Sequence, residues 1–326
     1  KTGASTWTLS GDNSYSGLTT ISAGTLKLGA NGGAVNTPLG TTNAATTIAS
    51  GATLDLNGFT LGTAEAITSM AGTGVSGAGA LTNTGANASY SGPITLITPG
   101  ATISATSSGT LSLSGNIIGN FPLTLDGNGI GNFSGLRSGT GTLIKQGTGT
   151  WTLSGLNTYT GTTTVTGGVL RAENNTVVAS TNGPFGNNAS GLILNGGTIQ
   201  SNVITFSRPI TVTATNSGLD AYGAARTISS AITLATAGTF NLNIGGTTAA
   251  SAEGQELTLS GIISNSSGTL GLTKTGTSKV ILSGTNTFTG GVSLNSGTLN
   301  IDNNQALGTV AGTFTIAGGT IDASSS

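Results

Sequence analysis

The sequence contains no cysteine and no histidine, and only 6% of its 326 residues are charged. Without cysteine there is neither a disulfide framework nor a thiolate metal site. Without histidine the chain lacks the usual general base, the commonest metal ligand and the side chain that titrates near neutral pH. We therefore expect a protein that is not an enzyme, with no catalytic residues, no bound metal and no cofactor.

Charge of either sign, aromatic residues and long apolar runs are also scarce. The formal net charge is −1 and aromatic residues make up 4% of the chain, so no basic surface for nucleic acid is expected. No apolar run approaches the roughly 20 residues that a membrane helix needs, which predicts no membrane span in this window. The chain is instead rich in glycine, with 56 copies, and in Thr, Ile, Val and Leu. Abundant β-branched residues favour folded strands over disorder.

One stretch occurs three times without a gap, at Lys1–Leu28, Lys145–Ala172 and Lys274–Ile301. Repeats of this kind indicate a stacked architecture. Apolar positions coincide in all three copies, which predicts an inward-facing repeat core formed by Trp7, Leu9, Tyr15, Ile21, Leu26, Trp151, Leu153, Tyr159, Val165, Leu170, Val280, Leu282, Phe288, Leu294 and Leu299. Glycine and asparagine tolerate positive φ, and we predict tight corners at Gly11, Asn13, Gly155, Asn157, Gly284 and Asn286.

The copies divide one continuous chain into superunits 1–144, 145–273 and a partial third, 274–326. Shorter phrases recur between them, such as NTPLG at 36–40 and NGPFG at 182–186. The pattern is weakest between Leu61 and Gly92, where we expect an irregular excursion. Because the sequence opens and stops within repeat units, we expect a fragment of a longer repetitive protein, with any export signal outside it.

The local patterns predict short strands and no helix. Apolar and polar residues alternate with period two, as in Thr53 to Leu56, and no segment has helical periodicity. Asn-Gly pairs occur at Asn31, Asn57 and Asn195 among other places, but unevenly matched flanks at these three argue against hairpins there. We therefore predict an all-β fold, a right-handed parallel β-helix of roughly 15 coils at about 20 residues each.

The repeated pattern LxKxGxGTWTLSGxNTYTGxTTVxxGxL resembles the autotransporter-associated β-strand repeat, or passenger-associated transport repeat, of secreted bacterial surface proteins. The resemblance is strong over Leu143–Leu170 and Leu272–Leu299 and good over Lys1–Leu28. It implies a right-handed parallel β-helix that is extracellular or on the cell surface. The repeat itself has no catalytic residues, so the resemblance assigns none here.

Candidate reactive groups are few and scattered. Polysaccharide-cleaving enzymes need clustered carboxylates, whereas the ten acidic residues lie far apart in the sequence. Asp55 and Asp322 fall at equivalent positions, and Gln200 occupies that position in the second superunit. A corner ladder, meaning hydrogen bonds between equivalent polar residues on successive coils, explains them as well as a reactive site does. Two local ion pairs are expected, Asp126 with Arg137 and Asp220 with Arg226. Asn-x-Ser/Thr triplets, which chance produces in such a composition, start at Asn87, Asn132, Asn174, Asn188 and Asn265.

Three classes of function remain open. The favoured one is a non-enzymatic structural or adhesive rod or fibre subunit of a bacterial surface or matrix. Its expected partners are other copies stacked end to end, or a surface polysaccharide or host or cell-surface ligand. The alternative is a carbohydrate-binding or carbohydrate-cleaving β-helix with Tyr90, Tyr222 or Phe133 as sugar platforms. A third class, ice or crystal binding through Thr162 to Thr166, requires threonines in register on successive coils.

Overall fold

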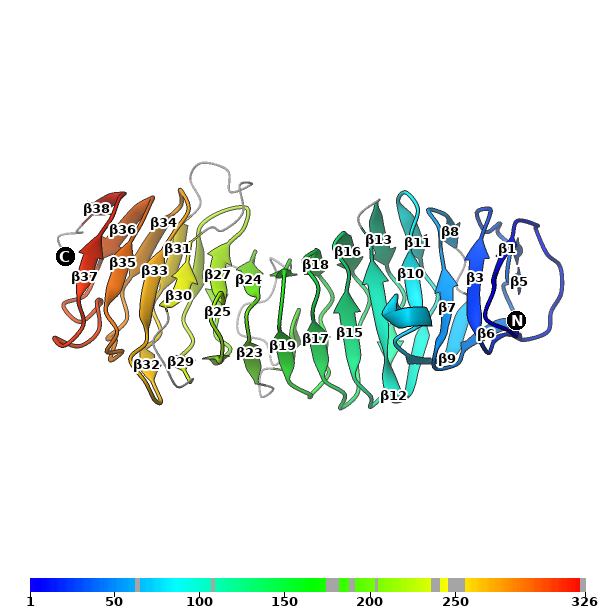
Figure 1. Ribbon diagram of the computed structural model, residues 1–326, viewed down its shortest axis with the longest axis horizontal. Coiled ribbons are helices and arrows are strands. Elements are labelled where there is room, and N and C mark those ends of the chain that lie inside the picture. Colours follow the sequence, from blue (N-terminus) through cyan, green and yellow to red (C-terminus); the bar gives the residue numbers. More distant parts are fainter. Residues whose placement is uncertain are drawn as a thin grey trace. The chain divides into compact units, whose positions relative to one another are not determined.

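The computed structural model describes residues 1–61, 65–106, 109–173, 182–187, 191–202, 205–235, 241–245 and 256–322. Short strands run parallel to one another in stacked coils (Figure 1), which confirms the predicted all-β solenoid. It has about 13 turns, fewer than the roughly 15 expected, because several coils are longer than the length of about 20 residues that the prediction assumed. The coil that separates Gly24 from its register partner Ala52 is longer than the coil that separates Leu123 from Leu143. The described residues contain no α-helix and one 3₁₀ turn, η1 (Val75–Gly77).

The chain forms two compact units, the first from Lys1–Thr163 with Asn182–Asn187 and the second from Thr164–Thr181 with Asn188–Ser326. In the first unit each coil has three sides. The first face contains β1 (Thr6–Leu9), β3 (Gly24–Leu28), β7 (Ala52–Asp55), β10 (Leu81–Asn83), the second half of β12 (Ile94–Ala105), β15 (Leu123–Asp126) and β17 (Leu143–Lys145). The second face contains β8 (Thr60–Leu61), β11 (Ala88–Tyr90), β13 (Thr110–Leu113), β16 (Ile130–Phe133) and β18 (Thr150–Leu153). The third contains β2 (Thr19–Ile21), β6 (Ala45–Ile48), β9 (Ala66–Gly72), the first half of β12 and β14 (Ile117–Ile118).

Two antiparallel hairpins also belong to the first unit. They are formed by β4 (Asn36–Thr37) with β5 (Gly40–Thr41), and by β21 (Asn182–Gly183) with β22 (Gly186–Asn187). These hairpins are the two phrases NTPLG and NGPFG that the sequence shows to be equivalent. Each hairpin follows a copy of the repeat in the sequence and is hydrogen-bonded to residues of that copy, as described below.

The second unit also has three parallel sheets. One contains β23 (Leu192–Leu194), β26 (Ile210–Val212), β29 (Ile232–Leu234) and β32 (Ile263–Asn265). Another contains β20 (Val169–Ala172), β24 (Thr198–Ser201), β27 (Gly218–Ala221), β30 (Asn241–Ile244), β33 (Gly271–Lys274), β35 (Val292–Leu294) and β37 (Phe314–Ile316). The last contains β25 (Thr205–Phe206), β28 (Arg226–Ile228), β31 (Glu256–Leu259), β34 (Lys279–Leu282), β36 (Thr298–Ile301) and β38 (Thr320–Asp322). Strand β19 (Thr163–Val165) lies at the boundary between the units.

Alternation along each strand places one set of side chains inside the coil. In β3, for example, buried and half-buried residues alternate from Gly24 to Leu28. Because the strands are in register, inward residues of successive coils stack in columns. Removing each such side chain from water stabilises the fold by about 1.5–3 kcal/mol. One buried column of the first unit consists of Leu26, Leu54, Leu81, Ile103 and Leu125.

The segment from Leu61 to Gly92, expected to be irregular, is largely regular where the structure describes it. It contains β9, β10 and β11, and Met70 and Tyr90 are buried. Residues 62–64 lie outside the described residues. The expected irregularity is present in part, because η1 lies in this segment and β9 pairs with β6 and β12 through shifts of register, whereas β10 and β11 pair regularly.

The copies of the repeat start on different faces of the coil. In the first unit, β1 of the first copy lies in the first face, whereas β18 of the second copy lies in the second face. In the second unit, β20, the last strand of the second copy, pairs with β24, whereas β36, the last strand of the third copy, pairs with β38 in another sheet. The spacings between the copies therefore do not correspond to whole numbers of coils.

Candidate functional site

Twelve of the fifteen proposed core residues are buried. Trp151 lies beneath Gly131 of the preceding coil, its register partner, which leaves room for the indole ring. The exceptions are in the first copy: Trp7 is 55% exposed, Tyr15 is 41% exposed and Leu9 is half-buried. Trp7 differs from the expectation because β1 pairs with β3 alone in the described chain, so no coil covers its other side.

The corner asparagines connect successive coils through both ends of their amides. Asn157 Oδ1 accepts a hydrogen bond from Arg137 N at 2.6 Å, and Asn157 Nδ2 donates to Pro184 O at 2.6 Å. A buried amide is stable only when its donors and acceptor are bonded. The other copies repeat these contacts, with Ile263 N to Asn286 Oδ1 at 2.9 Å, Asn286 Nδ2 to Ala306 O at 2.7 Å and Asn13 Nδ2 to Pro38 O at 2.8 Å.

Positive φ is not the reason for the corner glycines and asparagines. None of the six corner residues has it. Glycine is needed at two of the corners because the coils approach closely there: a Cβ on Gly155 would lie 2.1 Å from Gly135 O, and one on Gly284 would lie 2.3 Å from Gly261 O. These corners are therefore places of stacking rather than of unusual backbone conformation.

A pair of hydroxyl groups fixes the hairpin that follows the second copy. The hydroxyls of Tyr159 and Thr163 are 2.6 Å apart, and Thr163 Oγ1 donates to Phe185 O at 3.2 Å. Tyr15 and Thr19 form the same contact at 2.7 Å in the first copy. In the third copy the equivalent positions are Phe288 and Val292, so both hydroxyls are lost together. The repeat thus holds the hairpin with a matched pair of side chains.

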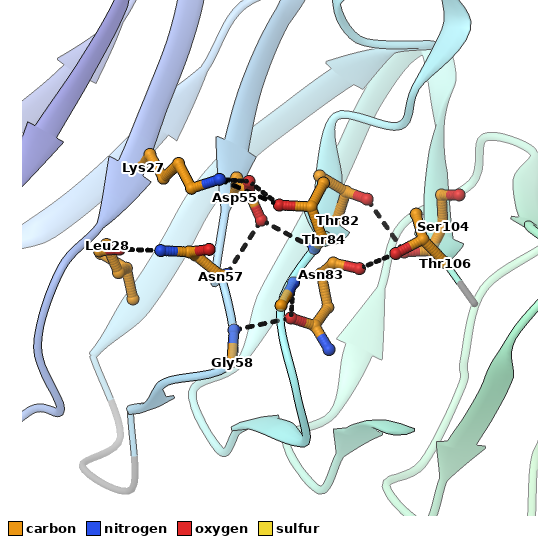
Figure 2. A network of polar contacts seen from close by, with 11 residues as sticks. Lys27, Leu28, Asp55, Asn57, Gly58, Thr82, Asn83, Thr84, Ser104 and Thr106 are labelled. Carbon is orange, nitrogen blue, oxygen red and sulfur yellow. Dashed lines mark hydrogen bonds and ion pairs between the residues drawn. The ribbon is translucent and has the colours of Figure 1, made fainter. Parts of the chain in front are cut away.

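A polar network of the first unit surrounds Asp55, which is 3% exposed (Figure 2). Its carboxylate accepts hydrogen bonds from Asn57 N at 2.9 Å, Thr84 N at 3.0 Å and Thr84 Oγ1 at 2.5 Å. Lys27 Nζ lies 3.4 Å from Asp55 Oδ2. Both carboxylate oxygens are therefore engaged, and their partners among the described residues are amide, hydroxyl and ammonium groups.

The rest of this network joins four successive coils (Figure 2). Asn83 Oδ1 accepts from Gly58 N at 2.8 Å, and Asn57 Nδ2 donates to Leu28 O at 2.9 Å. Thr106 Oγ1 donates to Asn83 O. Each of these side chains bonds to an adjacent coil, which supports the corner-ladder interpretation of Asp55 rather than a reactive centre.

An equivalent ladder follows each copy of the repeat. Lys27, Arg171 and Asn300 occupy the same position in the three copies. Their register partners on the next coil are Asp55, Gln200 and Asp322, the three positions that the sequence shows to be equivalent. The bonds run from Arg171 Nη2 to Gln200 Oε1 at 3.0 Å, from Gln200 Nε2 to Asp220 Oδ2 at 3.0 Å and from Asn300 Nδ2 to Asp322 Oδ2 at 3.0 Å.

Neither ion pair expected from the sequence is formed. Arg137 is buried and donates to Gly119 O and Phe121 O, each at 2.9 Å, and burial lowers the pKa of its guanidinium to about 10. Arg226 bonds to the side chain of Asn202 rather than to Asp220. The ion pairs of the described residues are instead Lys27 with Asp55, and Lys279 with both Glu256 and Asp322.

The proposed sugar platforms are mostly inaccessible. Tyr90 and Phe133 are 1% and 2% exposed. Tyr222 is half-buried, and the guanidinium of Arg171 lies 3.6 Å from its ring centroid.

Among the described residues, no three acidic side chains are grouped so that they could hold a metal ion, and no helix could cross a membrane. The triplets at Asn174 and Asn188 lie outside the described residues.

Threonines do stand in register in one sheet of the second unit. Thr205, Thr227 and Thr258 are successive register partners. The column then continues with Ile281 and Asn300. The row of hydroxyls is therefore short, and it could not be found by reading along the chain because its members lie in different coils.

Sequence reasoning missed the lysine that opens each copy. Lys145 and Lys274 are fully buried and bond to backbone carbonyls. The available signal was a charged residue at the same place in three copies of a chain with very little charge, each followed two residues later by glycine.

Comparison with known families identifies the same three segments. The model of the passenger-associated-transport-repeat matches residues 1–28, 143–172 and 272–301. Comparisons with curated proteins and with solved structures gave no match.

Proposed function

We propose that this chain, which carries three passenger-associated-transport repeats and folds as a parallel β-solenoid, is a non-enzymatic passenger segment that forms a structural or adhesive rod outside a bacterial cell. The observation that carries the proposal is the use made of the repeat's own polar residues. Asn157 and Asn286 each bond to the coil before and to the loop after. The asparagines common to the copies thus hold neighbouring parts of the stack together.

The surface chemistry supports a role in contact rather than in reaction. Asp55, the buried acid of the network in Figure 2, is bonded to an ammonium, a hydroxyl and backbone amides. The chain has 9 basic and 10 acidic residues in 326, so its surface carries few charges. Such a surface suits contact with neutral polysaccharide or with other rods more than electrostatic capture of a charged partner.

Stacking end to end is the mode of self-association that we propose. The ends of a solenoid present open strand edges, and such an edge pairs readily with another strand. A strand from a second copy of the chain would close it.

Imaging of the full-length protein on the producing cell tests the proposal most directly. Antibody labelling should locate it outside the cell, and negative-stain images of the native material should show thin fibres or long rods. Intracellular labelling, or compact monodisperse particles, would contradict the proposal.

An activity assay separates the proposal from a carbohydrate-cleaving β-helix. The purified protein should leave a panel of polysaccharides intact, with calcium or without it. Any unsaturated product absorbing in the near ultraviolet would show lyase activity and would remove the structural interpretation.

A further inference from the structure

Two lysines stand in columns of the core where apolar residues are expected. Lys145 is the register partner of Leu125, and Lys274 lies between Ile244 and Leu294. Both are 0% exposed. Burial of an ammonium group in an apolar column is costly unless it is fully hydrogen-bonded. Lys274 forms no ion pair within the described residues, so something other than a carboxylate must hold its charge.

Backbone carbonyls of three coils surround the Lys274 ammonium. Its Nζ donates to Thr275 O at 2.6 Å and Gly276 O at 2.9 Å in its own coil, and to Ser296 O at 3.1 Å in the next coil. Gly245 O of the preceding coil lies at 3.5 Å. An ammonium has three protons to donate, and charge-assisted bonds of this kind are stronger than those between neutral groups. The three contacts of 3.1 Å or less match the number of donors.

Two glycines shape this cage of carbonyls. Gly276 and Gly297 have φ of 67° and 70°, values that side-chain-bearing residues rarely adopt. A Cβ on Gly297 would lie 2.5 Å from Lys274 Nζ. Glycine is therefore needed at this position both for the backbone conformation and for the space that the ammonium occupies.

The other two copies repeat the contacts that this lysine makes within its own coil, with Lys1 half-buried and Lys145 fully buried. Lys1 Nζ donates to Gly3 O at 2.6 Å and Ala23 O at 2.8 Å, and Gly3 and Gly24 have φ of 79° and 66°. Lys145 Nζ donates to Gln146 O at 2.5 Å and to Gly147 O at 3.0 Å. Gly147 and Gly168 have φ of 69° and 58°. The opening lysine, a glycine just after it and a second glycine towards the end of the copy thus recur together.

We propose that each copy of the repeat contains a binding site for a primary ammonium group, made of backbone carbonyls and filled by the repeat's own lysine, which ties its coil to the next. The inference does not depend on what the rod contacts, because it concerns the interior of the solenoid. The competing explanation is that the lysine only fills the core with its methylene groups. A methionine of similar volume distinguishes the two, since it keeps the packing and removes the donors.

Burial of this amine also makes the stability of the fold depend on pH. Burial lowers the pKa of the Lys274 amine to about 8, with a smaller opposing effect of Asp220, whereas an unfolded lysine titrates at about pH 10.4. At neutral pH the group is still mostly an ammonium. Between these two values the folded state holds fewer protons than the unfolded state, so the free energy of unfolding rises with pH.

Chemical labelling of the native full chain tests the site without any substitution. An acetylating reagent should modify the partly exposed Lys27 and Lys279 at least about 100-fold faster than Lys274, because reaction requires opening of the fold. Mass spectrometry of the digested protein gives the rate at each residue. Similar rates at Lys274 and Lys279 would overturn the proposal.

Substitution tests the chemistry of the cage. Lys274→Met should lower the melting temperature by several degrees, whereas the surface control Lys279→Met should change it little. In Lys274→Ala, n-propylammonium should raise the melting temperature more than it does for the unsubstituted protein, and 1-propanol should not. Equal stability of Lys274→Met and Lys279→Met, or equal rescue by the two additives, would show that the lysine is only a spacer. If Lys274→Ala does not fold, the comparison of Lys274→Met with Lys279→Met decides.

Discussion

The hydroxyls of Tyr159 and Thr163 form a contact that the third copy replaces on both sides, with Phe288 and Val292. Such a paired replacement is expected when a buried donor and acceptor depend on each other, because losing one partner leaves the other unsatisfied. Tyr159 and Thr163 are both 0% exposed. Within one chain, the three copies thus provide their own comparison of a polar and an apolar solution to the same packing problem.

A double-mutant cycle at this pair should show strong coupling. Thr163→Val alone should reduce the free energy of unfolding by about 1–3 kcal/mol, because the buried Tyr159 hydroxyl loses its partner. Tyr159→Phe combined with Thr163→Val should cost less than the sum of the single substitutions, by about 1 kcal/mol. Denaturant unfolding of the four proteins measures this, and simple additivity would contradict the argument.

The buried carboxyl of Glu65 makes stability depend on pH. Glu65 is 0% exposed, and the hydroxyls of Thr37 and Thr46 each donate to it at 2.9 Å. Burial raises the pKa of this carboxyl, although the two hydroxyl donors oppose the change. The folded state therefore holds the proton to a higher pH than the unfolded state, so stability is full at low pH and is lost as pH rises through the raised pKa.

Glu65→Gln should remove this part of the pH dependence. The amide keeps an acceptor for one threonine and cannot ionise. We expect the midpoint of denaturant unfolding to decline from pH 4 towards pH 8 less steeply in the variant than in the unsubstituted protein. Parallel pH profiles for the two proteins would exclude Glu65 as the source.

At the scale of the element, the sizes of paired residues on neighbouring strands compensate for each other. Gly131 faces Trp151, whereas Leu257 faces Val280 at the equivalent position of the third copy. A large residue on one strand is thus matched by a small one on its neighbour. Close packing in protein interiors makes such compensation necessary, since inserted atoms force neighbours to move.

Gly131→Ala should therefore destabilise the pairing of β16 with β18. The added Cβ would lie 2.3 Å from the Trp151 ring, and overpacking of this kind costs about 1–3 kcal/mol. Gly17→Ala is the matched control, because nothing lies within 4 Å of a Cβ there. Circular dichroism during denaturant unfolding gives both values, and equal midpoints would contradict the packing argument.

The strands themselves could be predicted from the sequence, because alternation such as that of Thr53 to Leu56 has a period that only a strand explains. The bonding partners could not. Asn157 connects Arg137 with Pro184, and which residues of other coils meet an asparagine depends on coil length, which varies. The cause predicted for the corner glycines, positive φ, is wrong for a similar reason. Positive φ is a local property of the backbone, whereas the closeness of Gly155 to Gly135 O depends on how the coils stack.

The buried lysines show the same limit in the candidate site. Lysine is almost never fully buried in proteins, so composition alone places Lys145 and Lys274 on the surface. Their burial depends on carbonyls from neighbouring turns, including Ser296 O for Lys274. A repeated charged residue in a chain that is only 6% charged is the sequence feature that would indicate such a site in related repeats.

At the scale of the whole molecule, stability should be independent of calcium. Calcium-dependent solenoids gather several acidic side chains around each ion, whereas the acidic residues of the described ladders are bonded to lysine, asparagine, glutamine and threonine. We expect the same thermal unfolding curve in a chelator and in millimolar calcium. A rise of several degrees in the melting temperature on adding calcium would contradict this.

The start of the copies on different faces has a consequence for how such a chain grows. Duplication of a superunit that is not a whole number of coils does not simply extend the stack. It also places each later copy on a different face of the coil, so that an identical loop points in a new direction. Within one stack of coils, chains that differ only in copy number would then display the same sequence on different faces, and variation in length would become variation in orientation without any change of residue.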